Sequence, residues 1–283
     1  MRTLLVILFI SLTSVTNHAY ADDERSEAAK AAWNRKDYET AYRLLIPLAK
    51  EGIEDAQITL GHMLDLGIGG VKQDYEQALH WFRLLAEKKS GRGQFYLGQM
   101  YENGRGVEKD VAEAIRLYQL AAVNEDFKDF RAQHRLSNLY AIGKGVTKDL
   151  KMSFMWEVKA AENGYDFAQH QLSKMFRYGT GVESDAALAL LWEKRSAESG
   201  YDKAQFGLAG MYYDGYGATQ DYEKAFYWYL KAAEQGLQDA QCMVASFYEE
   251  GIGVKRDLSK SDYWLNKATR QGASPNECDP ISS

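Results

Sequence analysis

The stretch AQFGLAGMYYDGYGATQDYEKAFYWYLKAAEQG, residues 204–236, decides the fold. Its first half places large apolar side chains four residues apart, at Leu208 and Tyr212, which is the spacing of one helix face. A glycine-rich reversal follows, and then Asp221, a residue type that caps helix N-termini. The second half carries Trp228 between alanines and ends at a glycine, a common residue after a helix C-terminus. The stretch therefore predicts two helices joined by a tight turn.

The same pattern occurs six times along the chain. The capping aspartate returns at intervals of 36, 39, 36, 36 and 36 residues, as Asp74, Asp110, Asp149, Asp185, Asp221 and Asp257. The bulky residue seven positions later is Trp81, Leu117, Trp156, Trp192, Trp228 or Trp264. Self-similarity with this period is typical of stacked helical repeats, in which neighbouring units complete each other's core. We therefore expect an all-α fold, a right-handed α/α solenoid of antiparallel helix pairs, with the tryptophans as interior packing residues.

These motifs resemble the Sel-one-like repeat, a relative of the tetratricopeptide repeat. The family pattern is Ala-x3-Leu-Gly-x2-Tyr-x2-Gly-x-Gly-Val-x2-Asp-x3-Ala-x2-Trp-x3-Ala-Ala-x2-Gly, and residues 204–236 match it best. The chain departs from it at Gly93 in the alanine place, at Leu117 in the tryptophan place, by an extra glycine within 67–70 and by three added residues within 124–131. We expect a signal peptide over 1–21, an N-terminal capping helix pair over 22–55, six repeats over 56–273 and a C-terminal tail over 274–283.

The first 21 residues differ from the repeats. Arg2 precedes an apolar run over Leu4–Leu12, and the segment ends Ala19-Tyr20-Ala21. This arrangement predicts a secretory signal peptide that is cleaved after Ala21. An uncleaved membrane anchor is the alternative, but the run is shorter than the roughly 20 residues that a spanning helix needs. We expect a periplasmic or secreted protein without stable membrane insertion.

The composition is that of an ordinary folded chain, with 46% hydrophobic and 26% charged residues and three prolines. The net charge is −6, and loss of Arg2 with the signal peptide would make it 33 − 40 = −7. Proteins that bind nucleic acids normally present a basic face. We therefore expect no nucleic-acid partner.

Cys242 and Cys278 are the two cysteines of the chain. An exported protein meets an oxidising compartment, which favours a disulfide. Their separation of 36 residues, however, would place them in neighbouring repeats, farther apart than a disulfide reaches unless the tail folds back. The sequence leaves open whether they pair.

The histidines and glycine motifs do not indicate chemistry. His134 and His170 occupy equivalent places two residues into successive first helices, so we expect half-buried packing residues; no cysteine or close carboxylate completes a metal-ligand set. The Gly-x-Gly turns lack the preceding strand and the third glycine of a dinucleotide site. No Ser-x-x-Lys acylation motif follows residue 21. We expect no catalytic residue, no metal and no cofactor.

The resemblance implies a scaffold or adaptor, acting in envelope regulation or host interaction, that binds a protein or peptide through a concave groove lined by the first helices. Partner-binding candidates lie six or nine positions after the alignment alanine of a repeat: His62, Gln99, Asn138, Lys174, Arg177 and Tyr213. The same face includes Asp65, Glu102, Ala141, Gly210, Ser246 and Glu249. On this interpretation the groove is acidic at its ends and basic around its middle.

The family resemblance also leaves two alternatives. A cysteine-rich branch of the family is associated with β-lactam binding and hydrolysis, which would make the protein an enzyme. That branch carries a cysteine pair in nearly every repeat, whereas this chain has two cysteines in all. A purely structural spacer is the other alternative, and it predicts no saturable ligand.

Overall fold

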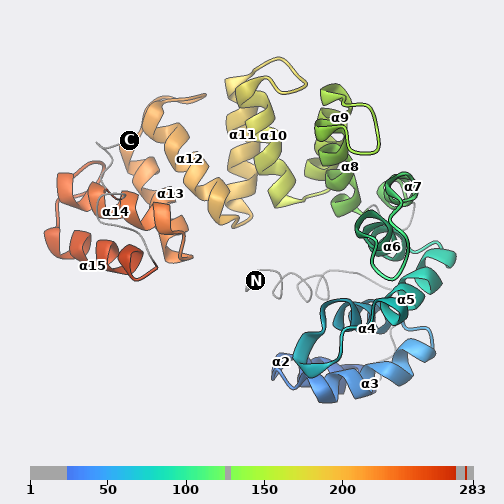
Figure 1. Cartoon of the computed structure of the whole chain (residues 1–283). Helices are drawn as coiled ribbons and strands as arrows, with labels where there is room; N and C mark the ends of the chain where they lie inside the picture. The colour runs from blue at the N-terminus through green and yellow to red at the C-terminus, as the bar shows by residue number, and fades with distance from the viewer. Residues whose placement is uncertain (1–23, 125–128, 272–277, 279–283) are drawn as a thin grey trace. The chain divides into compact units, whose positions relative to one another are not determined.

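Helices joined by short loops form the part of the chain that the structure, a computed structural model, describes: residues 24–124, 129–271 and Cys278 (Figure 1). No strand occurs within these ranges. The expected signal peptide and most of the expected tail lie outside the described residues. The elements are α2 (Glu24–Asn34), α3 (Tyr38–Lys50), α4 (Glu54–Leu66), the 3-10 turn η1 (Ile68–Gly70), α5 (Tyr75–Glu87), α6 (Gly91–Asn103), α7 (Val111–Ala122), α8 (Phe130–Ile142), α9 (Leu150–Glu162), α10 (Asp166–Tyr178), α11 (Ala186–Glu198), α12 (Asp202–Asp214), α13 (Tyr222–Glu234), α14 (Gln238–Glu250) and α15 (Leu258–Thr269).

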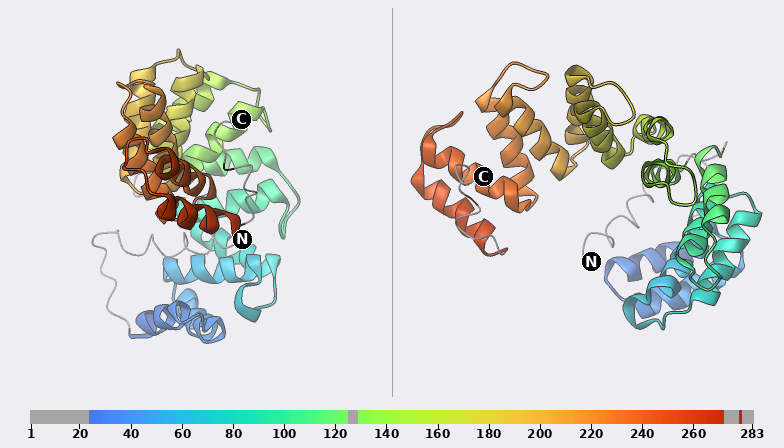
Figure 2. Two further views of the ribbon diagram at one scale, coloured as in Figure 1. Left: turned by 90° about the vertical axis from the view of Figure 1, so that its left-hand side faces the viewer. Right: turned by 45° about the horizontal axis from the view of Figure 1, so that its top comes forward.

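The helices divide into two compact units, one ending at Ala132 and the other beginning at Gln133, within α8. In the first unit α2–α3, α4–α5 and α6–α7 pack as pairs, and α3 also packs on α4 and α5 on α6. The second unit repeats this scheme from α9 to α15 (Figure 2). The predicted all-helical fold of stacked pairs is confirmed.

Each second helix begins at its predicted aspartate. The six carboxylates accept hydrogen bonds from backbone N–H groups of the first turn at 2.9–3.1 Å. An anion is favoured there because the first N–H groups lack helical partners and the helix dipole is positive. The N–H of Gln77 is the main reason why the pKa of Asp74 lies below its usual value. The aspartates are therefore structural caps.

In four of the turns, the second glycine lies against the start of the second helix of the preceding repeat. Gly217 has φ +73°, and a Cβ there would lie 2.3 Å from the carbonyl oxygen of Ala186, the first residue of α11. A residue with a side chain would meet both a strained backbone and a steric clash. Gly106, Gly181 and Gly253 make the equivalent approach to Tyr75, Leu150 and Tyr222. The Gly-x-Gly motif thus serves repeat stacking.

The tryptophans are less interior than predicted. Trp156 and Trp264 are buried, but Trp81, Trp192 and Trp228 are only half-buried. The residue after the tryptophan position points more directly inward in every repeat but the last: Phe82, Tyr118, Glu157, Glu193 and Tyr229 are all at most 4% exposed. Trp81, Trp192 and Trp228 instead lie at the edge of the core. Lys159 stacks 4.2 Å from the Trp156 ring and Arg195 4.5 Å from the Trp192 ring.

Candidate protein-binding surface

The first-helix face, defined by the positions six and nine residues after each alignment alanine, is most exposed on α10. Lys174 is exposed and Arg177 is half-buried. The Arg177 guanidinium lies 4.9 Å from the ring centroid of Tyr216 and 5.8 Å from that of Tyr178. No carboxylate within the described ranges forms an ion pair with either cation. This part of the predicted surface therefore carries two available positive charges.

His62 is buried, so its prediction as a partner-binding residue is wrong. Its side chain lies edge-on to the rings of Phe82 and Tyr96, with centroids 5.5 and 4.2 Å away, and the residue is 8% exposed. Its Nε2 has no hydrogen-bond partner among the described residues. Burial, together with the charges of Arg131 and Arg92, lowers its pKa to about 3. His62 is therefore a neutral packing residue of the first unit.

The acidic groups predicted for the first-unit end of the face are also buried. Asp65 is 7% exposed and pairs with Arg105 at 2.8 Å, and desolvation raises its pKa even though the arginine opposes that shift. Glu102 is 1% exposed and accepts a hydrogen bond from the Tyr118 hydroxyl at 2.9 Å. The Asp65–Arg105 pair thus joins two repeats, whereas Glu102 is bonded within its own repeat. The expectation of an acidic end in this unit is wrong.

The remaining candidates are half-buried and partly engaged. Gln99 and Tyr213 are intermediate in exposure, and the Tyr213 ring lies 5.3 Å from that of Tyr222. The Asn138 side-chain nitrogen lies 2.8 Å from His134 Nε2. The structure therefore leaves Lys174 and Arg177 as the most available of the predicted residues.

Two histidine–glutamate pairs lie beneath the first-helix face of the second unit, and the sequence analysis missed their glutamates. The repeat-3 pair is His134–Glu157, with Nδ1 2.9 and 3.0 Å from the two carboxylate oxygens. The repeat-4 pair is His170–Glu193, with both distances 3.0 Å. Glu157 and Glu193 are 2% and 3% exposed. Each of these two histidines therefore has a buried carboxylate beside it, which the sequence analysis did not predict.

The sequence did contain a signal for these pairs. A glutamate occupies an interior position that is aromatic in three other repeats, and it follows the histidine by 23 residues both times. No described group of three His, Cys, Asp or Glu side chains could hold a metal ion. Each pair is thus a two-residue contact within the part of the chain that the structure describes.

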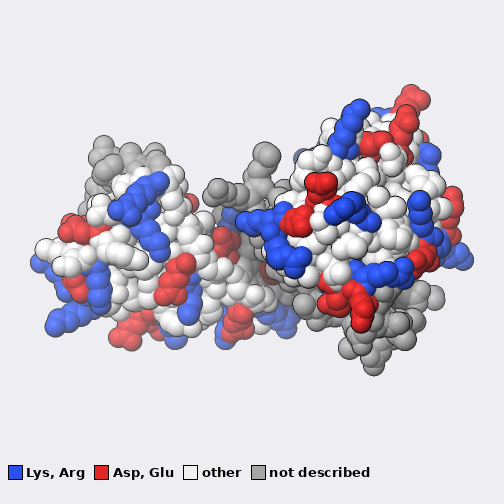
Figure 3. Space-filling view, turned by 90° about the horizontal axis from the view of Figure 1, so that it is seen from below, with Lys and Arg blue, Asp and Glu red and all other residues white. Residues whose placement is uncertain are grey.

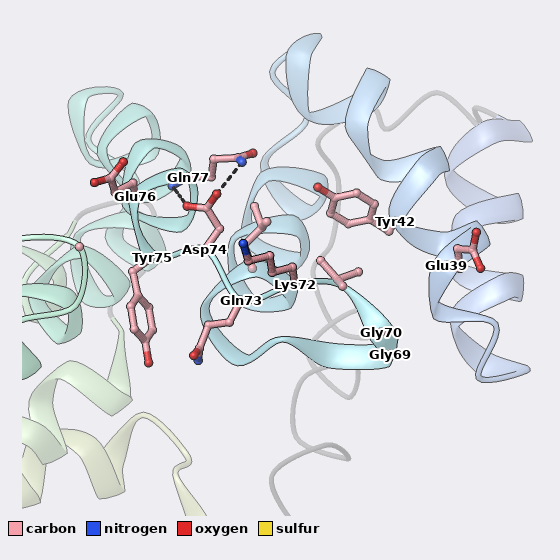
Figure 4. Close-up of a pocket in the computed structure, with 13 residues that line it drawn as sticks. Glu39, Tyr42, Gly69, Gly70, Lys72, Gln73, Asp74, Tyr75, Glu76 and Gln77 are labelled. Carbon is pink, nitrogen blue, oxygen red and sulfur yellow. Dashed lines mark hydrogen bonds between the residues drawn. The ribbon is translucent and has the colours of Figure 1, made fainter.

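An open hollow of about 850 Å³ lies beside the first glycine turn, between that turn and α3 (Figure 4). Its lining includes Gly70, the extra glycine, and the exposed side chains of Lys72 and Glu39. The carboxylate of Asp74 is occupied by the backbone and side chain of Gln77, at 3.0 and 2.7 Å. The hollow therefore offers mixed charges and a carboxylate that already caps α5.

Charges of both signs are interspersed on the molecular face drawn in Figure 3. Lysine and arginine side chains alternate there with aspartate and glutamate, so this face is not uniformly basic. Within the described ranges, every helix is too short or too polar to cross a bilayer.

Cys242 and Cys278 are joined in a disulfide, with Cα atoms 4.7 Å apart. Cys242 lies on α14 and packs against Ala268 of α15. The chain therefore returns to α14 after α15, which is the fold-back that a bond between these two cysteines requires.

Comparison with known proteins gives one family. The Sel1 repeat pattern matches residues 54–90, 91–122, 130–165, 166–201, 202–237 and 238–272. Among solved structures, the chain is similar to a protective antigen present in uropathogenic Escherichia coli strains displaying an SLR fold, with 34% identity, a TM-score of 0.73 and coverage of 86% of this chain and 51% of that one. It is also similar to a Sel1 repeat protein from Oxalobacter formigenes, with 30% identity, a TM-score of 0.66 and coverage of 89% and 99%.

The curated relatives described below match this chain over short segments. A stretch of 55 residues is 46% identical to beta-lactamase HcpA of Helicobacter pylori, and it covers 19% of this chain and 22% of that protein. The matching segments span between 14% and 22% of the length of the first curated relatives. These similarities therefore concern the repeat unit.

Proposed function

Because the chain belongs to the Sel1 repeat family, we propose that it is a scaffold that binds a protein or peptide partner through its first-helix face, the predicted concave surface. Sel1 repeats typically mediate protein interactions. The observation that carries the proposal is the pair Lys174 and Arg177, two cations on one helix face without carboxylate partners in the described structure. Charges of this kind set the orientation and on-rate of a partner.

We further propose that the protein acts outside the cytoplasm, in the periplasm or beyond the cell, in envelope regulation or contact with host proteins. The residues from Arg2 to Ala21 have the pattern of a cleaved signal peptide. The Cys242–Cys278 disulfide fits an oxidising compartment.

Affinity capture from an envelope fraction tests the binding surface. The double variant Lys174→Glu with Arg177→Glu is expected to lose the partner, because four units of charge change on the first-helix face. The matched control is Lys151→Glu with Lys194→Glu, an equal change on exposed positions of the second helices α9 and α11. Retention of the same partner by all three proteins would place the interface elsewhere.

A second candidate function is β-lactam binding or hydrolysis. The 46% identity to beta-lactamase HcpA over 55 residues is the observation that favours it. Purified protein would then hydrolyse nitrocefin in a saturable way, whereas the scaffold proposal predicts no turnover above the rate of a heat-denatured sample.

A further inference from the structure

Repeats 3 and 4 each place a histidine–glutamate pair at two interior positions where repeat 5 has two aromatic residues. In the repeat after the repeat-4 pair, the equivalent positions hold Phe206 and Tyr229, with ring centroids 5.2 Å apart. An aromatic pair fills the place without taking a carboxylate out of water, which is a costly step. Packing alone therefore does not account for His170 and Glu193 at these positions.

The geometry of the repeat-4 pair leaves one ring nitrogen open. A carboxylate at neutral pH only accepts hydrogen bonds, so His170 Nδ1 donates to Glu193 and Nε2 remains for another partner. No described residue bonds to His170 Nε2, and this atom is not among the buried polar atoms that lack a partner. The His170 side chain is 15% exposed. Its Nε2 is therefore open to solvent, where it accepts a hydrogen bond when neutral and donates one when protonated.

In the repeat-3 pair, by contrast, the outer ring nitrogen of the histidine already has a partner. Its outer ring nitrogen, His134 Nε2, lies 2.8 Å from the side-chain nitrogen of Asn138. The residue of α10 that is equivalent to Asn138 is Lys174, which makes no such contact. The two pairs thus share an interior contact and differ in what they present outward.

His170 lies in line with the two available cations. His170, Lys174 and Arg177 are at i, i+4 and i+7 of α10, the spacing of one helix face. Arg177 is held over the Tyr216 ring of the next turn at 4.9 Å. Three nitrogen-bearing groups therefore follow one another toward the C-terminal end of α10.

The surroundings of His170 contain other charges. Glu193 faces it from α11, and the Tyr201 ring lies 5.6 Å away, at the N-terminus of α12. Asp166 and Asp202, in the first turns of α10 and α12, contribute to the raised pKa of Tyr201 after burial. Their carboxylates accept bonds from the next backbone N–H at 2.7 Å. Asp166 thus lies four residues before His170 on α10 and Lys174 four residues after it, on opposite sides of the histidine along the helix.

We propose that the first-helix face of α10 binds an acidic peptide segment, whose carboxylates contact Lys174, Arg177 and the protonated Nε2–H of His170. The proposal rests on the peptide-binding function above and specifies its partner. Protonation of His170 adds a charge-assisted hydrogen bond. Affinity is therefore higher when His170 carries a second ring proton, until the peptide carboxylates are themselves protonated near pH 4.

The test uses the full chain and two labelled peptides, an alternating Glu-Gly dodecamer and its Gln-Gly counterpart. Fluorescence anisotropy at low salt gives Kd at pH 7.5 and 5.5. The expected result is binding of the Glu peptide that tightens about tenfold at pH 5.5, the size of one added charge-assisted contact. The Gln peptide should bind more weakly and without this pH dependence.

A double variant isolates the pair without leaving a buried carboxylate alone. His170→Phe with Glu193→Tyr recreates the aromatic pair of the next repeat and should keep the helical signal while losing the pH dependence. The matched control is His134→Phe with Glu157→Tyr, which should retain the dependence because His134 Nε2 is already occupied. The single variant His170→Gln provides a second measurement should either double variant unfold.

The outcomes separate this proposal from the scaffold function. Equal binding of the Glu and Gln peptides, or full pH dependence in the folded His170 variants, would overturn the acidic-peptide site. The scaffold function would survive either result if envelope capture still depended on Lys174 and Arg177. The scaffold function through this face would be contradicted if the Lys174 and Arg177 double variant captured the partner as well as wild type does, whichever result the peptide titrations gave.

Discussion

The buried His62 predicts an acid-sensitive first unit. In the folded chain its pKa lies at about 3, below the ordinary 6.5 that it regains on unfolding. The unfolded state therefore binds more protons between these values, and stability is lost as the pH falls from about 6.5 toward 3. Between pH 7.5 and 5.0 this single group should remove about 2 kcal/mol from the free energy of unfolding.

The measurement is a pair of urea titrations at these two pH values for wild type and His62→Leu. Other acid-sensitive groups act on both proteins, so the change with pH in wild type minus that in the variant isolates His62. His80→Leu is the matched control, because His80 lies in the same unit but is exposed. An equal pH dependence in wild type and His62→Leu would refute the burial of this imidazole.

Two further predictions concern the second unit. Gly207→Ala should destabilise it, since a Cβ would lie 1.9 Å from a Glu193 carboxylate oxygen. Gly210→Ala on the same helix should stabilise it by up to about 1 kcal/mol, because the Cβ there would meet only the Tyr229 hydroxyl at 3.6 Å. Thermal unfolding that ranks the two variants in the opposite order would contradict this packing. Reduction of Cys242–Cys278, which closes a loop of 36 residues, should lower the free energy of unfolding by about 3–4 kcal/mol in urea titrations; no change would mean that the tail is not tied down.

The fold was predictable because its determinants are local and periodic. The capping role of Asp221 depends on the first turn of the helix that follows it, and the six repeats supply the same evidence six times. The packing stripe of the first helices follows from residues four apart for the same reason. Here the sequence and the structure agree.

The candidate surface was predictable only in part, because exposure at a repeat position depends on the neighbouring side chains. His62 and Lys174 occupy equivalent positions of their repeats. The rings of Phe82 and Tyr96 cover His62, whereas Lys174 is exposed to solvent. The sequence shows that Glu193 stands at an interior position, but not that it meets His170. That contact needs the distance between two helices, which no single-helix pattern contains.

The central claim is that the first-helix face is the binding surface. Photo-crosslinking is its most direct test. A benzophenone amino acid is placed at position 174 on α10 in one protein and at position 194 on α11 in another, both exposed in the structure. The account predicts that irradiation in the envelope fraction links a partner to position 174 and not to position 194. A partner linked from position 194 alone would contradict it.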